Sequence, residues 1–427
     1  MNRTMKETNI PWIGQIPDDW QVRQVKQVFN ICKEKANDKN PVVLSLARDS
    51  VKIRDISNNE GQLAESYENY NPVKIGDLLL NPMDLYSGAN CNVSEVEGVI
   101  SPAYSKLRAK VELEPRFFDY YFKSQYWTMA MFAHGKGVSF DNRWTLNNDT
   151  LKGYYLPFPP KEEQIKIVKA IKHKEERINA LISNEEKQIE KLKAYKQALI
   201  SEVVTKGLNP NVPMKDSGVD WIGKINCNYS LYKLKYLLSE PLLYGANAIG
   251  LKNGDFRFIR ITDISLDNKL KSNNDNQYLN AIDAEPFILK DGDVLFARSG
   301  ATCGKSFVYY DNYGPSCFAG YLIRARFKRN LIIPKYVGYF SKSSIYDLWK
   351  NQIFIQATIQ NISANKYAYL DMIVPSIEEQ HEIVAYLDKK ETLLDKMIRC
   401  HLNKIEKLKA YRQSIIYEYV TGKRKVY

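Results

Sequence analysis

The stretch Ile189-Glu190-Lys191-Leu192-Lys193-Ala194-Tyr195 recurs letter for letter at residues 405–411, at an offset of 216. Three shorter matches keep the same order in both halves of the chain: Trp12–Ile16 with Trp221–Ile225, Lys74–Leu79 with Lys290–Leu295, and Glu162–Gln164 with Glu378–Gln380. The first of these has an offset of 209 and the other two have 216, so one net insertion of seven residues separates them. Matches in a fixed order indicate duplication, and the 427-residue chain is therefore predicted to contain two copies of one unit.

Each unit ends in a long stretch with a helical pattern, at about residues 161–206 and 377–421. Neither stretch contains Pro, and Gly207 and Gly422 stand where a helix should end. Apolar residues recur at alternating spacings of three and four from Val168 to Val203, and again from Val384 to Tyr419. This spacing is typical of a coiled-coil seam. An amphipathic helix packed on its own domain is the alternative, but globular helices average only about 11–12 residues.

Three of the eleven seam positions are polar in each helix, and they fall at the same places in both. They are Glu175, Glu185 and Lys196 in the first helix and Glu391, His401 and Arg412 in the second. An unpaired charge in a seam is costly, so these positions should fix the register of an antiparallel pair. We expect Glu175 near Arg412 and Lys196 near Glu391.

The helix starts explain the repeated Glu-Glu-Gln without any chemistry. Ser376 and Glu379 have the spacing of a capping box, and Pro160 stands at the first turn of the other helix. Glu162 and Glu163 place negative charge at the positive end of the helix dipole. We therefore interpret this motif as helix capping.

The part of each unit before its helix is rich in short β-type runs. Residues 42–46, 256–261 and 294–297 are predicted to be strands, with some helix near Phe117–Phe132 and Pro334–Trp349. The predicted fold class is α+β: a tandem duplication of a mixed, sheet-rich domain followed by a long helix, with the two helices paired as an antiparallel coiled coil. The expected division is a domain at 1–158, a helix at 159–207, a linker at 208–220, a domain at 221–375 and a helix at 376–424.

The composition suits a polyanionic partner, because 61 Lys and Arg against 49 Asp and Glu give a net charge of +12. The first domain is neutral up to residue 160, whereas residues 207–376 carry 20 basic and 14 acidic side chains. The six cysteines are scattered and only four histidines are present, so we expect no metal and no disulfide framework. No signal peptide or membrane span is apparent, which predicts a cytoplasmic protein without a membrane partner.

Three motifs that resemble enzyme signatures lack residues that the corresponding chemistry requires. Residues 299–306 end in Gly-Lys-Ser like a phosphate-binding loop, but Ser299 stands where Gly is needed and the next residues predict a strand. Asn81-Pro82-Met83-Asp84 lacks the second Pro and the aromatic residue of the adenine methyltransferase signature. Pro17-Asp18 has no Glu-x-Lys at a useful distance to complete a nuclease metal site. We expect no catalytic residue and no cofactor.

The order and duplication of these pieces resemble one family, the specificity subunits of type I restriction–modification systems, over essentially the whole chain. The residues that carry the resemblance are Trp12–Trp20 with its echo at Trp221, Asn81–Ala89 with Ile100–Tyr104, Arg298–Lys305, the Glu-Glu-Gln helix entries and the paired Glu-Lys-Leu-Lys-Ala-Tyr helices. One departure is Pro160-Lys161 before the first Glu-Glu-Gln, where the second unit has Ser376-Ile377.

The resemblance implies that each globular part is a target-recognition domain that reads one half of a split, asymmetric double-stranded DNA sequence, with the helices as a ruler. It also implies recruitment of two modification subunits, which carry the adenine methyltransferase, and then of restriction subunits, which carry the nuclease and translocase. A function of another class, a non-catalytic coiled-coil scaffold whose globular domains bind proteins, stays open at this point.

The loops after the Gly76-Asp77 and Gly292-Asp293 strands are expected to approach DNA. Arg, Asn, Gln and Ser suit base edges, and Lys suits phosphate. The candidate DNA-binding residues are Tyr86, Ser87, Lys136, Asn142 and Arg143 in the first domain, and Tyr244, Arg257, Arg298, Ser299, Lys305, Gln356 and Gln360 in the second.

Overall fold

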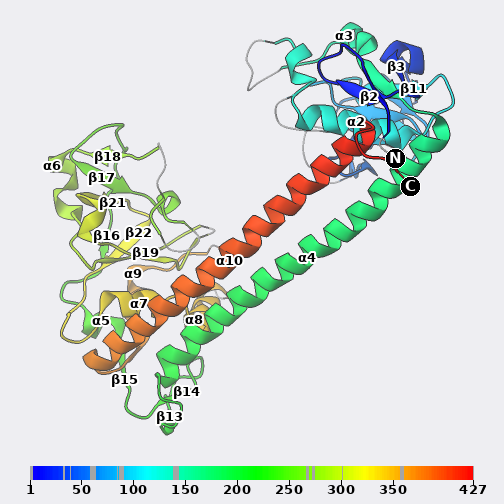
Figure 1. Ribbon diagram of the computed structural model, residues 1–427. Coiled ribbons are helices and arrows are strands. Elements are labelled where there is room, and N and C mark those ends of the chain that lie inside the picture. The colour runs from blue at the N-terminus through cyan, green and yellow to red at the C-terminus, as the bar shows by residue number, and fades with distance from the viewer. Residues whose placement is uncertain are drawn as a thin grey trace. The chain divides into compact units, whose positions relative to one another are not determined.

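The structure, a computed structural model, describes residues 3–31, 34–38, 40–57, 64–83, 85, 91–137, 144–265, 269–271, 275–300, 302–355 and 360–426. The chain divides into two compact units (Figure 1). Unit 1 consists of Met1–Glu186 and Leu402–Tyr427, and unit 2 consists of Lys187–His401. Each unit combines one sheet-rich domain with one half of each long helix, which is the tandem α+β arrangement that the repeats predicted.

The two long helices are α4, Lys161–Lys206, and α10, Ile377–Val420. Every predicted seam position is buried or half-buried, while the residues between them along the middle of each helix are almost all exposed. Gly207 and Gly422 follow the helices with φ of +80° and +72°, a backbone conformation that favours glycine at a helix end. The predicted seam is therefore confirmed residue by residue.

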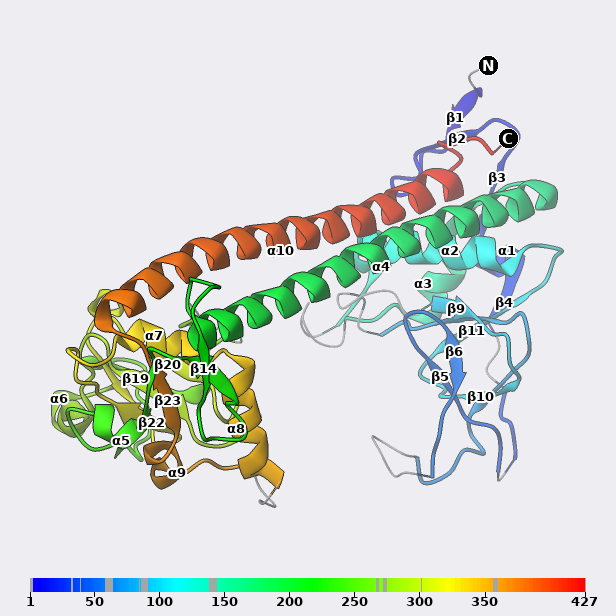
Figure 2. The same cartoon turned by 90° about the horizontal axis from the view of Figure 1, so that it is seen from below.

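The two long helices are neighbours in both units (Figures 1 and 2). In unit 1 the apolar core includes Ile171 and Ile178 of α4 together with Ile415 and Tyr419 of α10. In unit 2 the core includes Val203 of α4 and Leu387 of α10. Early residues of one helix thus share a core with late residues of the other, which is the predicted antiparallel pairing.

The main sheet of unit 1 is antiparallel, in the strand order β4-β11-β8-β9. Its strands are β4 (Phe29–Ile31), β8 (Leu78–Leu80), β9 (Cys91–Val93) and β11 (Ser105–Ala109). Four two-stranded pairs surround it: β1 (Met5–Glu7) with β2 (Gln15–Pro17), β3 (Gln21–Gln24) with β12 (Tyr155–Phe158), β5 (Leu44–Leu46) with β6 (Val51–Ile53), and β7 (Asn71–Val73) with β10 (Gly98–Ile100). Its short helices are α1 (Val25–Val28), α2 (Pro115–Trp127), η1 (Phe132–His134) and α3 (Asn148–Gly153).

Unit 2 repeats this plan, with a main antiparallel sheet in the order β16-β22-β19-β20. Its strands are β16 (Leu243–Tyr244), β19 (Val294–Ala297), β20 (Ser306–Val308) and β22 (Leu322–Ala325). Other strands are β13 (Met214–Asp216) with β14 (Lys224–Asn226), β15 (Ser230–Lys233) with β23 (Asp371–Val374), and the sheet of β18 (Tyr278–Leu279), β17 (Phe256–Ile259) and β21 (Ser316–Phe318). The short helices are α5 (Leu234–Leu237), η2 (Ile261–Asp263), α6 (Ala281–Ala284), η3 (Glu285–Phe287), η4 (Asp311–Tyr313), α7 (Pro334–Phe340), α8 (Ser344–Ile355) and α9 (Ala364–Ala368).

Several element boundaries differ from the sequence expectation. The helix expected over Pro334–Trp349 is two helices, α7 and α8, because the Ser343 hydroxyl donates to the Phe340 carbonyl at 2.6 Å and accepts from the Tyr346 amide. The strand expected at 256–261 ends at Ile259 and turns into η2. The segment expected to be a linker, 208–220, includes β13, which pairs with β14. The residue division into domains otherwise stays a prediction.

The Glu-Glu-Gln motif has a larger role than capping. The Glu379 amide does donate to the Ser376 hydroxyl at 3.2 Å, as the capping-box spacing predicted. The fully buried Gln164 also accepts from the Glu114 amide at 2.9 Å, directly before α2. Gln380 accepts from the Ile333 amide at 2.8 Å, directly before α7. Each glutamine thus fastens the first turn of a long helix to the first turn of a domain helix.

The repeated Gly-Asp before β8 and β19 forms a buried ion pair. Asp77 and Asp293 are about as buried as any charged residue of the chain, with 2% and 1% of their surface exposed. Arg108 donates two hydrogen bonds to Asp77 at 2.8 and 2.7 Å, and Arg326 binds Asp293 with the same two distances. Gly76 and Gly292, with φ of +89° and +81°, make the turn that aims each carboxylate inward. The motif therefore supports the strand that precedes the candidate DNA-facing loop.

Candidate nucleic-acid interface

Five polar residues gather in unit 2 at the end of the central strand β19, and we name them the Arg298 cluster: Tyr244, Arg298, Ser299, Gln360 and Asn361. Arg298 and Ser299 follow β19 directly, and Tyr244 ends the edge strand β16 of the same sheet. The Arg298 guanidinium carbon lies 4.8 Å from the centre of the Tyr244 ring. Ser299 and Asn361 form a β-bridge, and the Ile362 amide donates to the Arg298 carbonyl at 2.8 Å. The sheet thus brings together residues more than a hundred positions apart.

The polar groups of this cluster are incompletely paired. Arg298 makes no ion pair with any residue in the described ranges. Its buried Nε and the buried Oδ1 of Asn361 have no hydrogen-bond partner among the described residues. Buried polar groups of folded proteins are nearly always paired, and these two atoms lack such a partner within the described part of the chain. Arg298 is half-buried and lies over the Tyr244 ring, and the donors of an arginine can pair with a base edge or a phosphate.

The loop after the cluster is a hairpin connection. Gly300 and Gly304 have φ of +76° and +86°, and the Gly304 amide donates to the Ala297 carbonyl at 2.8 Å. The Cys303 thiol donates to the Arg298 carbonyl at 3.1 Å, and burial raises the pKa of this thiol, which keeps its proton. The chain then enters strand β20, as the sequence predicted, whereas a phosphate-binding loop opens a helix.

The remaining candidates of unit 2 are Arg257, Lys305 and Gln356. Arg257 belongs to β17 in the second sheet, where its guanidinium donates to the Lys271 carbonyl at 3.0 Å and to Asn276 at 2.9 Å. Arg257 thus contacts two residues of the segment that follows it, and its role in DNA binding stays a prediction. Lys305 is half-buried at the start of β20, and Gln356 lies outside the described residues.

In unit 1 most candidates cannot be placed, because Tyr86, Ser87, Asn142 and Arg143 lie outside the described residues. Lys136 is exposed and exchanges two backbone hydrogen bonds with Thr145, at 2.8 and 2.9 Å. The Leu146 amide donates to the Pro82 carbonyl at 2.8 Å, which matches the bond from Ile362 to Arg298 in unit 2. Pro82 therefore occupies the position of Arg298, and the first domain has no arginine at the equivalent place.

Sequence reasoning missed two members of this surface. Asn361 follows the candidate Gln360 directly, but only the bridge to Ser299 shows that it belongs to the cluster. Tyr321 has 63% of its surface exposed, and its carbonyl accepts from the Arg298 amide at 3.0 Å. A search for exposed aromatic residues at strand ends could have found Tyr321, but the chain has 29 tyrosines and no motif marks this one.

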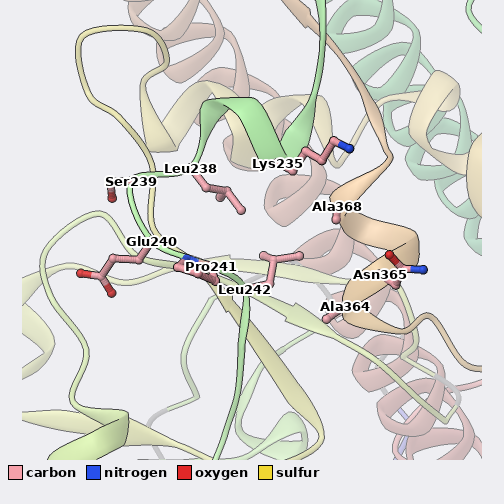
Figure 3. Close-up of a pocket in the computed structure, with 9 residues that line it drawn as sticks. All are labelled: Lys235, Leu238, Ser239, Glu240, Pro241, Leu242, Ala364, Asn365 and Ala368. Atoms are coloured by element: carbon pink, nitrogen blue, oxygen red, sulfur yellow. The ribbon is translucent and has the colours of Figure 1, made fainter.

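A cavity of about 570 Å³ lies in the same unit, between the loop after α5 and helix α9 (Figure 3). Leu238, Leu242 and Ala368 give it an apolar lining. Its charged groups serve other contacts: Lys235 lies 4.0 Å from the centre of the Tyr369 ring, and Glu240 pairs with Arg324 and Arg326. Within the described ranges there is also no His, Cys, Asp and Glu group suited to a metal, and no helix long and apolar enough to cross a membrane.

Comparison with known proteins matches this duplicated architecture to one family. The sequence model of the type I restriction modification DNA specificity domain matches residues 17–191 and again residues 248–409. The chain belongs to this family. The two matches fall on the two halves that the internal repeats defined, so the specificity subunit contains the domain twice.

Curated relatives are distant in sequence. The EcoBI specificity subunit of Escherichia coli is 24% identical over 451 residues, covering 97% of this chain and 88% of that protein. The StySPI specificity subunit of Salmonella potsdam is 20% identical over 318 residues, covering 73% of this chain and 65% of that protein, slightly less than two thirds of its length.

The fold also has a counterpart among solved structures. A chain from the work on complex assembly and conformational transition of the type I R-M system is 16% identical, covers 95% of this specificity subunit and 98% of that chain, and has a TM-score of 0.68. At this identity the likeness establishes the fold alone.

Proposed function

We propose that this specificity subunit reads a bipartite, asymmetric double-stranded DNA sequence, with one half-site bound by each domain, and that it does so without catalysing a reaction. The observation that carries the proposal is the Arg298 cluster: an arginine that forms no ion pair with any described residue stacks on Tyr244 at the end of a central strand. Arg298 and Pro82 occupy equivalent positions, so the two domains should read different bases, as an asymmetric target requires.

The repeated helix motif supports recruitment of two copies of one partner. Tyr195 and Tyr411 each have 52% of their surface exposed, and the preceding ion pairs, Lys193–Glu190 and Lys409–Glu406, are both 3.0 Å long. Exposed substitutions usually change stability by less than about 0.5 kcal/mol, so folding alone does not keep these side chains identical after duplication. Exposed tyrosines are frequent anchors of protein interfaces. We assign these two surfaces to two modification subunits, which carry the methyltransferase and are in turn joined by restriction subunits.

A gel-shift assay with the modification subunit present tests the proposal. Retention of one DNA sequence over a scrambled control, at a salt concentration that removes non-specific binding, is the expected result. A failure to retain DNA even at low salt, with the protein complex assembled, would instead favour the scaffold whose domains bind proteins.

Replacing Arg298 with Ala should cost roughly 1–3 kcal/mol of specific binding, because a guanidinium paired with a guanine edge is lost. Arg298→Lys keeps the charge but not the two-pronged donor geometry, so it should lose most of the same specificity. The matched control is Arg329→Ala, which removes a charge from an exposed arginine paired with Asp291. Unchanged binding and an unchanged methylation pattern for Arg298→Ala would remove this residue from the interface.

A further inference from the structure

The two places where a domain meets the long helices are equivalent in sequence but differ in their ion pairs. In the first junction, α2 lies beside α4 in unit 1 (Figure 2); in the second, α7 lies beside α10 in unit 2 (Figure 1). Pro115, Tyr120 and Lys123 of α2 match Pro334 and Tyr339 of α7, and Lys342 two residues beyond it, at an offset of 219. The long-helix positions match at 216, so the same side chains can be compared one by one.

The second junction is a connected network of charges centred on Glu391. Lys342, in the turn after α7, lies 3.0 Å from this carboxylate, and Lys196 of α4 lies 2.8 Å from it, which confirms the expected pairing of Lys196 with Glu391. Lys196 also pairs with Asp395 at 2.8 Å. Burial would raise the pKa of Glu391, but the two lysines outweigh it and lower the pKa to about 2. One seam carboxylate thus joins the domain and both long helices.

A second acidic position on α10 adds to this hold. Asp388 pairs with Lys335 of α7 at 2.7 Å and accepts a hydrogen bond from Tyr339 at 2.6 Å. Tyr339 also donates to Glu391 at 3.2 Å. Helix α7 is therefore tied to α10 by one ion pair and two tyrosine hydrogen bonds, and Lys342, two residues after α7, adds a second ion pair.

The first junction keeps the tyrosine bond but lacks these ion pairs; its own ion pairs to α4, Lys161–Glu112 and Arg3–Glu163, lie instead at the first turn of that helix. Tyr120 donates to Glu175 at 2.6 Å, but α4 has Lys172 where α10 has Asp388, and Asn179 where α10 has Asp395. Arg412 consequently donates to Asn179 at 2.8 Å, and the expected pair with Glu175 is not formed. Within α2, α4 and α10, all of which the structure describes, no ion pair joins α2 to a long helix.

The cavities at the two junctions also differ in size. A polar cavity of about 750 Å³ lies at the first junction, lined by residues of α2, α4 and α10, whereas the cavity at the second measures about 240 Å³. Lys123, which matches the bridging Lys342, pairs with Asp119 on its own helix at 2.8 Å instead. The buried Asp119 replaces Gly338 of the second unit, and its Oδ1 has no hydrogen-bond partner among the described residues.

We infer that Asp388, Glu391 and Asp395 are positioning residues that lock the second recognition domain onto the long helices, while the matching part of the first junction, beyond the ion pairs at the first turn of α4, is compliant. The inference rests on the proposed function for its consequence: a domain that pivots on its junction accepts half-sites displaced along the DNA, so the compliant first junction supplies most of the tolerance to altered spacing. Breaking the second lock should add tolerance, and importing its acids into the first should remove it.

Two double variants and a control test this inference. Asp388→Asn with Asp395→Asn removes the Lys335–Asp388 and Lys196–Asp395 ion pairs of the second junction and leaves those of Glu391. Lys172→Asp with Asn179→Asp imports both acids into the first. The control, Glu186→Gln with Glu382→Gln, removes two exposed helix charges for which the structure gives no ion pair. Hydrogen–deuterium exchange of the full chain reports the hold on α2 and α7, and methylation of targets with the gap changed by one base pair reports the tolerance.

In the wild type α7 should exchange more slowly than α2. The double Asp→Asn variant should speed exchange of α7 roughly fivefold. It should also raise the methylation of targets with an altered gap relative to that of the original target. The imported acids should slow exchange of α2 and lower this methylation ratio. Unchanged exchange of α7 would overturn the lock. If exchange of α7 changed but the methylation ratio did not, the lock would have no role in specificity for the spacing of the target. Exchange needs no DNA, so a protein that never methylates specifically would refute the proposed function while the lock is judged separately.

Discussion

Replacing Asp293 with Ala should lower the free energy of unfolding of unit 2 by about 3–5 kcal/mol, because it leaves a half-buried arginine without its main partner. Asp293 has 1% of its surface exposed. Its carboxylate accepts hydrogen bonds from Nη2 of Arg326 at 2.7 Å and from Nε of Arg326 at 2.8 Å. The Asp293 carboxylate also accepts a hydrogen bond from the Lys290 amide at 2.8 Å, which closes the turn before β19. Since β19 leads directly to Arg298, the variant should also lose specific DNA binding.

Urea unfolding followed by circular dichroism measures this loss, and a neighbouring residue provides the control. Asp291 pairs with Arg329, and both side chains are substantially exposed, at 43% and 62%. Asp291→Ala should therefore change stability by less than about 1 kcal/mol. The double variant Asp293→Leu with Arg326→Met should regain part of the loss, since an apolar pair can replace a buried ion pair. A stability of Asp293→Ala equal to that of Asp291→Ala would contradict the role given to the Gly-Asp motif.

Adding one heptad to both long helices should lengthen the non-specific gap of the DNA target by about three base pairs. Seven residues extend a helix by roughly 10 Å, and DNA rises about 3.4 Å per base pair along each strand. Duplicating residues 182–188 and 398–404, which are 216 positions apart, preserves the seam in both helices. The two half-sites should not change, because no residue of either domain is altered.

Methylation of targets with graded gaps measures this effect. A heptad added to α4 alone is the control, and it should abolish assembly or methylation because the seams no longer match in length. A variant with both heptads that assembled and still methylated the original spacing would show that the helices are not the ruler.

The parts of the fold that depend on local periodicity could be predicted from sequence. The seam spacing gave the extent of both long helices within a few residues, and the alternation around Leu44 and Val294 located two strands. The pairing of Lys196 with Glu391 also followed from the matched seams. These predictions succeed because the residues concerned interact with neighbours whose place is fixed by a regular repeat.

The contacts that cross between a domain and its helix could not be predicted in this way. Glu175 was expected to meet Arg412, but it accepts from Tyr120, which lies 55 residues earlier on another helix. Arg298 and Tyr244 are both candidate DNA-binding residues, but their contact likewise depends on the strand order β16-β22-β19. No local pattern encodes a partner whose position depends on the packing of a whole domain.

The central claim, that each domain reads its own half of a split DNA sequence, is tested most directly by exchanging one domain. Residues 221–374 would be replaced with the matching domain of a related specificity subunit, and the methylated sites of a host carrying each chain with its modification subunit would be sequenced. We expect a bipartite motif in which only one half differs between the two chains. A change in both halves, or methylation without a bipartite motif from an assembled complex, would contradict the claim.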